Sequence, residues 1–415
     1  MSSIYSFFSN PGVILAFKYL YYSAPVWLSF CLVVLWYEVW RTYQRVAFIH
    51  KQTYTLLEIK IPKEIFKSPA AMEFLFNSLY QTFGEDDFKI KWDRWPPKIV
   101  KHHHWTGSVR PWFSFEICAI DGKVHFFIWT RAGSKALIES QLYSQYPGVE
   151  IYEVPDYTLP VSYDPETMGL WCTELILSKA DAFPIKTYID YGMDKDPKDE
   201  YRIDPLTPLI EFLGGLPPGQ QAWIQIVITA HKATDAVKDP KTGKVEMKDL
   251  KWSESAKEEI KNILDKAKPP KPKEGEAEQN APRSLTDGEK DTVAALERSV
   301  SKKGFDTGIR AIYFAPKDVF NVATGGGITA GISHFNSSMN GFKGNKVIDL
   351  DGDKEGILDA YKNRGYFYAE YKGPTFVLNT EELATIFHLP AGVTTSPAFD
   401  RIGSKKAQAP SNLPQ

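Results

Sequence analysis

Cysteine is scarce in this chain. Only three occur in 415 residues, and Cys31, Cys118 and Cys172 lie far apart in the sequence. That spacing gives neither the paired thiolates of a zinc knuckle nor the density of a disulfide framework, and it fits a reducing compartment.

An excess of charge of one sign is also missing. The 49 Lys and Arg residues nearly balance the 51 Asp and Glu residues, which leaves a formal net charge of −2. A general attraction to nucleic acid or to an acidic membrane surface is thereby excluded, so any such binding requires a local patch. Because 415 residues exceed one typical core and 43% of them are hydrophobic, we expect two folded soluble domains.

Complete nucleotide-binding and calcium-binding motifs are absent from the sequence. Lys241–Lys244 lacks the glycine spacing of a phosphate-binding loop and the Ser or Thr that holds magnesium. Asp349–Asp353 begins like a calcium loop, but Lys354 takes the glycine position and Ala360 that of the bidentate glutamate. We therefore expect no intrinsic ATPase activity, and a turn at the aspartates.

Two other clusters have both a functional and a structural interpretation. His102–His104 offers three imidazoles, but consecutive side chains diverge and no carboxylate or thiolate stands at ligand spacing, so we favour an exposed loop over a metal site. Gly325–Gly327 offers backbone N–H groups to an anion, yet a flexible turn or distorted helix is favoured because no Lys-Ser/Thr follows. No Ser/His/Asp set is recognisable, so we predict no catalytic, cofactor-binding or metal-binding residue.

Basic and aromatic residues alternate between Lys89 and Trp105, as on a nucleic-acid-binding surface. The alternative is a loop whose tryptophans pack on a neighbouring sheet. Both interpretations stay open at this point.

One long apolar run is present near the N-terminus. Tyr19–Tyr37 carries no charge, and about 19 residues at about 1.5 Å each nearly cross a hydrocarbon core of about 30 Å. Aromatic rings crowd both ends, as they do at membrane interfaces. A buried core helix seldom stays uncharged this long, and no small-x-small cleavage site of a signal peptide precedes Arg41, so we predict a transmembrane helix over 19–40.

The basic residues beside this run predict its orientation. Lys18 alone precedes it, while Arg41, Arg45 and Lys51 follow it closely. By the positive-inside rule the C-terminal body should face the cytoplasm. Residues 11–20, within a short N-terminal segment (1–18), are too short to span and are expected at the interface.

The first part of the body, residues 51–160, shows a βαββαβ succession. Strands are predicted at 54–61, 112–120, 123–130 and 149–154, with Asp121-Gly122 as a type I′ hairpin turn. Ser68-Pro69 and Ser134 mark the starts of the two helices. This order is the split βαβ, or ferredoxin-like, arrangement.

The second part, residues 168–390, is expected to be another α+β domain with insertions. Strands are predicted at 171–178, 222–230, 309–315 and 366–371, and helices at 205–213, 254–266, 285–302 and from 319 towards 339. A charged, proline-bearing insertion at about 266–291 and an extended tail at 391–415 complete the chain. The predicted fold class is therefore α+β, with one transmembrane helix and two ferredoxin-like domains.

Several stretches together resemble a known type of protein. They are Leu57–Pro62 with Lys67–Met72, Arg202–Ile210, Trp223–Lys232, Phe335-Asn336 with Asn340–Lys343, and Leu378–Pro390. They resemble the membrane-anchored N-terminal region found ahead of HerA/FtsK-type and conjugative coupling-protein-like (type IV secretion) ATPase modules of poorly characterised bacteria. There, a tail like Lys405–Pro414 leads into the motor domain; here the Walker motifs are missing, which implies a free-standing anchor subunit or a separately encoded ATPase.

The resemblance and the missing catalytic set lead to one functional hypothesis. We expect a non-enzymatic membrane anchor and assembly subunit of a DNA-transfer or secretion machine, which docks a HerA/FtsK-like ATPase, other machine subunits or its own copies. The alternatives are a membrane-bound ligand sensor or enzyme with an unrecognised site, and a nucleic-acid-binding membrane adaptor that acts through residues 89–105.

Overall fold

The computed structural model divides the chain into two compact units. One comprises Met1–Gln52 and Asp86–Val109, and the other comprises Thr53–Glu85 and Arg110–Gln415. The residues that the structure describes are 11–62, 67–81, 107–195, 203–231, 235–238, 245–248, 252–266, 284–345, 354–367 and 373–390. Outside them lie five segments for which the sequence made predictions, namely 89–105 with its three histidines, 241–244, most of the 266–291 insertion, 349–353 and the tail 391–415.

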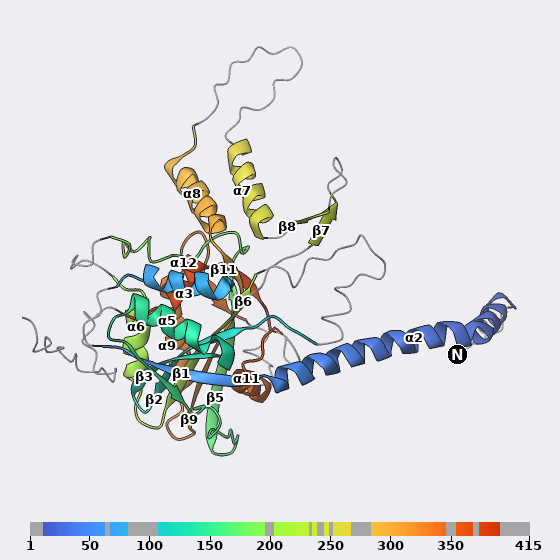
Figure 1. The fold of residues 1–415 in the computed structure, drawn as a ribbon, viewed down its shortest axis with the longest axis horizontal. Coiled ribbons are helices and arrows are strands. Elements are labelled where there is room, and N and C mark those ends of the chain that lie inside the picture. The colour runs from blue at the N-terminus through green and yellow to red at the C-terminus, as the bar shows by residue number, and fades with distance from the viewer. Residues whose placement is uncertain are drawn as a thin grey trace, which may run out of the picture. The chain divides into compact units, whose positions relative to one another are not determined.

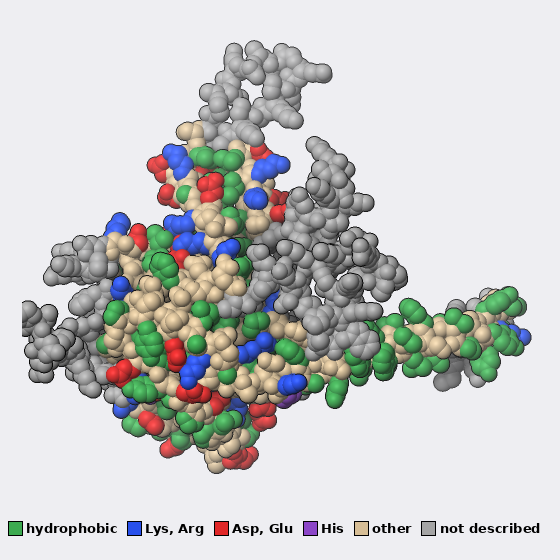
Figure 2. Space-filling view, in the orientation of Figure 1, with side chains coloured by type: hydrophobic (Ala, Val, Ile, Leu, Met, Phe, Trp, Pro, Cys, Tyr) green, Lys and Arg blue, Asp and Glu red, His purple; other side chains and the backbone are tan. Residues whose placement is uncertain are grey.

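In the described part of the first unit, residues 11–52 and 107–109, lies one long helix, α2 (Pro11–Lys51), of 41 residues. It includes the predicted span 19–40 and also residues 11–20, which are continuous with it rather than a separate interfacial piece. Its apolar side chains are exposed, with Val26 at 76%, Phe30 at 69% and Leu35 at 60%, and Figure 2 shows them along the helix. Among the described residues this is the one helix long and apolar enough to cross a membrane.

The second unit is built on a nine-stranded antiparallel sheet (Figure 1). Its order is β10-β5-β9-β6-β2-β3-β1-β4, and β11 pairs with the start of β9. A separate ribbon pairs β7 (Asp235–Lys238) with β8 (Val245–Lys248). The strands of the large sheet are β1 (Tyr54–Lys60), β2 (Phe113–Ile120), β3 (Lys123–Arg131), β4 (Glu150–Val154), β5 (Met168–Leu177), β6 (Gln221–Ala230), β9 (Gly304–Pro316), β10 (Phe342–Gly344) and β11 (Phe376–Asn379).

Helices cover both faces of this sheet. The helices of the second unit are α3 (Ala70–Gln81), α5 (Lys135–Gln145), α6 (Thr207–Gly214), α7 (Trp252–Lys266), α8 (Asp287–Ser301), α9 (Val322–Ile332), α11 (Lys354–Lys362) and α12 (Thr380–Ile386), with short 3-10 turns at Ala132–Ser134 and Ser333–Phe335. The main core forms where α3, α5, α6, α9 and α12 meet one face. On the other face, Tyr361 of α11 packs on Trp223 of β6.

Period-two alternation explains how one strand serves both faces. In β2, Phe113, Phe115 and Ile117 belong to the main core, so Glu116 and Cys118 between them point to the other face. The β2–β3 hairpin turns at Asp121 and Gly122, whose φ angles are 51° and 76°. Positive φ at both central residues is what a type I′ turn requires, and the predicted hairpin is confirmed.

The strands of the two predicted domains join in one sheet. The succession β1-α3-β2-β3-α5-β4 is followed by β5-α6-β6-β9-α9-β10, with β7, β8, α7 and α8 inserted between β6 and β9. The strand orders are β4-β1-β3-β2 and β10-β5-β9-β6. Strands β2 and β6 connect the halves, with Phe113 opposite Ile228 and Ala119 opposite Ala222. Two separate ferredoxin-like domains are therefore not confirmed; a mixed α+β body with one large antiparallel sheet is what the described residues form.

Four local predictions differ from the structure. Ser134 makes no side-chain cap for α5, because it lies within a 3-10 turn with helical backbone angles. Tyr366 and Phe367 form a bend after α11 rather than the start of a strand. Helix α8 begins at Asp287, inside the predicted insertion, where Thr286 and Glu289 form a capping box. The short elements β10, β11, α11 and α12 were not predicted.

Gly325–Gly327 lies inside the α-helix α9, which Asn321 caps, so the segment is a helix rather than a flexible turn, and one of its glycines has a packing reason. A Cβ at Gly325 would lie 2.3 Å from Cδ2 of Trp171, whereas one at Gly326 would meet nothing within 4 Å.

We predict that Gly325→Ala destabilises the full chain by about 1–3 kcal/mol through overpacking. Gly326→Ala should be neutral or stabilising by about 0.5–1 kcal/mol.

Urea unfolding in detergent micelles, followed by tryptophan fluorescence, measures both variants. Equal effects of the two alanines would contradict the close packing of α9 on Trp171.

Candidate functional site

Two clusters of charged side chains are buried on opposite faces of the sheet. Burying charge costs several kcal/mol per ion unless each ion is paired and hydrogen-bonded, so such clusters are candidates for specificity or function. The sheet-face network consists of Glu116, Cys118, Asp156, Tyr157, Gln225, Tyr361 and Arg364. The α12 cluster consists of Glu73, Thr187, Tyr188, Asp190, Arg298, Lys302, Asn379, Glu381 and Glu382.

The sheet-face network begins with a polar row across four adjacent strands. Glu116 of β2 lies opposite Gln225 of β6, and Gln225 lies opposite Arg310 of β9. Arg310 in turn lies opposite Glu174 of β5. All four side chains are buried, and the antiparallel register alone brings them together.

Arg364, which follows α11, binds the network together. Its Nε donates to Glu116 Oε1 at 3.0 Å, and its Nη2 donates to Asp156 Oδ1 at 3.1 Å. Although burial would raise the pKa of Asp156, the Arg364 guanidinium lowers it below its ordinary value. The backbone of Arg364 is left-handed, with φ of 49°. A non-glycine residue in that conformation indicates that its contacts determine its position.

A thiol and two phenols continue the sheet-face network. Tyr157 donates to Glu116 Oε2 at 2.8 Å and lies 2.8 Å from the Tyr361 hydroxyl. Cys118 Sγ is 3.0 Å from the Tyr157 hydroxyl. Burial raises the pKa of the Cys118 thiol, and the Glu116 carboxylate raises it further. The thiol is therefore held neutral, which is the opposite of an activated nucleophile.

Arg310 and Glu174 form the far end of the polar row. Both side chains are fully buried, and Arg310 Nε is 3.9 Å from Glu174 Oε1. Arg310 Nη2 donates to the Gly365 carbonyl at 2.6 Å, and its guanidinium lies 4.6 Å from the centre of the Tyr366 ring. Both buried arginines therefore hold the segment after α11: Arg364 belongs to this segment, and Arg310 contacts it from β9.

The α12 cluster surrounds a helix whose seven residues are all buried. Asn379 caps it by accepting from the N–H groups of Glu381 and Glu382, each at 2.9 Å. Glu382 completes the capping box by accepting from Asn379 N at 2.9 Å, and it also accepts from Ile185 N at 3.0 Å. A short polar helix is kept in the core by these bonds.

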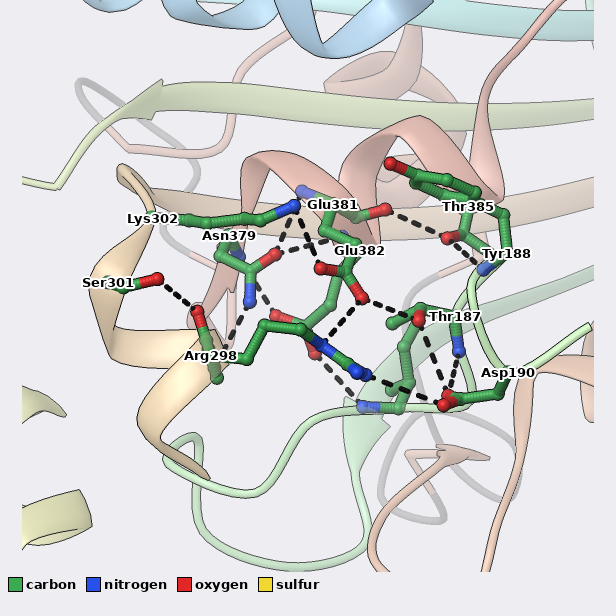
Figure 3. Close-up of polar contacts among 12 residues, drawn as sticks. Thr187, Tyr188, Asp190, Arg298, Ser301, Lys302, Asn379, Glu381, Glu382 and Thr385 are labelled. Carbon is green, nitrogen blue, oxygen red and sulfur yellow. Dashed lines mark hydrogen bonds and ion pairs between the residues drawn. The ribbon is translucent and has the colours of Figure 1, made fainter. Parts of the chain in front are cut away.

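Two cations, Arg298 of α8 and Lys302 just after its end, reach Glu381, the other glutamate of α12 (Figure 3). Lys302 Nζ is 2.8 Å from Glu381 Oε2 and 2.9 Å from Glu73 Oε1 of α3. Arg298 Nε is 3.3 Å from Glu381 Oε1, and its Nη2 is 3.4 Å from Asp190. Burial would lower the pKa of Lys302, but the bonds to Glu381 and Glu73 outweigh it and raise that pKa.

Glu381 and Glu382 are neighbours with different surroundings. Burial raises the pKa of Glu382 to about 8, and the nearby carboxylates of Glu381 and Asp181 raise it further, against the two backbone N–H bonds that lower it. Glu382 therefore holds a proton near neutral pH.

Three histidine–carboxylate pairs lie elsewhere in the second unit. They are His125 with Glu58 at 2.8 Å, His231 with Asp306 at 2.6 Å and His388 with Asp204 at 3.2 Å. Among the described residues, no group of three His, Cys, Asp or Glu side chains is arranged to hold a metal ion.

Cavities near these groups are small. The hollow beside Glu58 and His125 holds about 20 Å³. A second, lined by Ile117, Leu175 and other core side chains, also holds about 20 Å³. Each has room for about one water molecule.

Residues 100–401 match the family described as a domain of unknown function (DUF8128). The chain belongs to this family. No curated protein matches the chain. The matched region contains Glu116, Arg364 and the α12 glutamates, so both buried clusters lie largely within the DUF8128 domain, whereas α2 and β1 precede it.

The sequence predicted no site residue, and neither cluster was foreseen. One signal was present, since Asn379 followed three residues later by Glu382 is the pattern of a capping box. The cross-strand row has no comparable signal, because Glu116, Gln225 and Arg310 become neighbours only through strand register.

We predict that Arg364→Met destabilises the full chain by about 3–5 kcal/mol, since it leaves Glu116 buried without its cation. The double variant Glu116→Gln with Arg364→Met should lose less than the sum of the two single changes. Lys290→Met, which breaks the exposed pair with Asp287, should cost less than about 0.5 kcal/mol. Urea unfolding in micelles measures all four, and strict additivity would refute a coupled network.

Glu382 should make stability depend on pH. Because its pKa is about 8 in the folded chain against an ordinary 4.5, the folded state keeps a proton that the unfolded chain releases. The free energy of unfolding should therefore fall as pH rises from about 4.5 to 8, by at most about 5 kcal/mol from this group.

The Glu382→Gln variant tests this pH dependence by urea unfolding between pH 5 and pH 8. It should lack this part of the fall, while Glu297→Gln on the exposed face of α8 should keep it. Parallel curves for wild type and Glu382→Gln would show that Glu382 titrates normally.

Proposed function

We propose that this DUF8128 protein is a membrane-anchored, non-catalytic assembly subunit of a DNA-transfer or secretion machine, and that its body docks a HerA/FtsK-like ATPase. The proposal places α2 across the bacterial inner membrane and the body in the cytoplasm. It rests on the exposed apolar surface of α2, on the paired ions and small hollows of the body, and on the resemblance described above.

The exposed apolar surface of α2 carries the proposal. A water-soluble unit would bury Val26, Phe30 and Leu35 to gain about 25 cal/mol per Å², yet all three are exposed within the first unit. Lipid is the environment in which such a surface is stable. The helix of 41 residues is about 61 Å long, which exceeds a hydrocarbon core of about 30 Å.

The interior of the body supports a binding role over catalysis. Arg364 is paired with Glu116 and Lys302 with Glu381, the Cys118 thiol is held neutral, and the two hollows described above hold about 20 Å³ each. A binding site for a small substrate usually needs about 300 Å³ or more. Partners are then bound on the outer surface.

We further propose that the body is a fused pair of ferredoxin-like modules. The matching successions of elements and the matching strand orders β4-β1-β3-β2 and β10-β5-β9-β6 support this. In such a pair Glu58 of β1 corresponds to Glu174 of β5. Glu58 lies two strands outward from Glu116, across β3, and Glu174 lies two strands outward from Gln225, across β9.

Membrane insertion is tested with the full chain in bacterial cells. Carbonate-washed membranes should retain the wild type, and protease should digest the body in inverted vesicles but not in intact cells. Leu32→Arg with Val33→Arg, in the middle of the apolar run, should shift most of the chain to the soluble fraction, because each charge costs about 2.5–3.5 kcal/mol at the bilayer centre. Tyr43→Arg, beyond the predicted span, serves as the matched control. Digestion in intact cells would refute the proposed orientation.

Partner docking is tested by cross-linking in cells and purification in detergent. A HerA/FtsK-like ATPase should be recovered with the wild type, and also with a chain whose α2 is replaced by an unrelated transmembrane helix. Repeated recovery of the chain without any ATPase would overturn the docking role while leaving the membrane result intact.

A further inference from the structure

Helices α7 and α8 lie side by side and have a small core of their own (Figure 1). Ala256 of α7 and Leu296 of α8 are buried in it, with Ile260 and Ile263 packed alongside. Of the body, only Ala182 and Phe183 take part in this cluster among the described residues. The helix pair is thus cohesive in itself and shares little apolar surface with the main core.

The attachment of α8 to the body is mainly polar. Arg298 and Lys302, one helical turn apart, bind Glu381 of α12. Lys302 also binds Glu73 of α3, and Arg298 also lies beside Asp190. Figure 3 shows these two side chains converging on Glu381, Arg298 from the last turn of α8 and Lys302 from just after it. Three carboxylates from three separate parts of the body therefore hold two cations of the helix pair.

The attachment of α7 is also narrow. The Trp252 indole donates to the Asp181 carbonyl at 3.0 Å, and the His231 ring lies 6.4 Å from the Trp252 ring. This contact is at the first residue of α7, and the rest of the helix packs in the small cluster formed with α8, Ala182 and Phe183.

Exposure differs sharply between the partners of the ion pairs. The side chain of Glu381 is 2% exposed, whereas Lys302 is 22% and Arg298 is 34% exposed. The carboxylate thus lies behind the two cations, and it reaches water only when they move. Lys302 immediately follows the end of α8 and stands two residues before β9, so a small backbone change there is enough to move the helix.

We infer that the α7–α8 pair is a hinged arm, held against the body by a charge latch in which Arg298 and Lys302 bind Glu381, Glu73 and Asp190. In the latched state the arm covers Glu381. In the open state the two cations and the carboxylates are hydrated separately, and the arm keeps its own small core. This device is independent of the proposed function, since it concerns the body alone.

Hydrogen exchange measured by mass spectrometry on the full chain in micelles tests the latch. Replacing both Arg298 and Lys302 with Met should raise exchange rates in α7 and α8 by about tenfold or more, because local opening becomes easier. Exchange in the central strands β6 and β9 should stay as in the wild type. Lys290→Met, on the same helix but away from the latch, should change neither region.

A charge exchange separates an electrostatic latch from a packing effect. Glu381→Lys alone should open the arm, and combining it with Lys302→Glu should restore slow exchange in α7 and α8. The inference is overturned by any of three outcomes, namely no change in the double Met variant, faster exchange throughout the sheet to the same degree, or no restoration by the charge exchange.

Discussion

The antiparallel pairing of β2 with β6 is the constraint on which the rest of the body depends. By joining Phe113–Ala119 to Ala222–Ile228 it makes one wide sheet out of two sets of four strands. Both strands are central, so both of their faces must be covered. One face receives the apolar core beneath five helices, and the other receives α11, the residues after it and the sheet-face network.

Buried ions in this body act at the places where segments distant in sequence must meet. Arg364 ties the segment after α11 to β2 and to Asp156, over separations of 248 and 208 residues. Lys302 ties α8 to Glu73 of α3, 229 residues away. Apolar contacts tolerate sliding, whereas a buried ion pair is satisfied in a single arrangement. Such pairs add little net stability, and their value lies in excluding alternative arrangements.

Local signals in the sequence were enough to predict the regular elements but not their assembly. The Asp121-Gly122 turn and the apolar run 19–37 are each determined by the residues within them, so the sequence alone predicted a hairpin turn and a long apolar helix. Strand β11 and helix α12, by contrast, show the limit. Four strand residues are followed directly by seven helical residues, and each run is too short for its hydrophobic period to be recognised in the sequence. The buried polar residues of the sheet face could not be predicted from the sequence for a different reason. Glu116 and Arg310 look like surface residues until register and the cover from α11 bury them.

The two ends of the sheet restrict how copies of this protein can associate. Among the described strands, the sheet stops at β10, which has three residues, and at β4, which has five. Strand β4 also carries Glu150 and Glu153, and charges on an edge discourage edge-to-edge growth. A fibril-like ladder of bodies is disfavoured even where copies are crowded along a surface, so any ordered array has to use helical or loop surfaces as its joints.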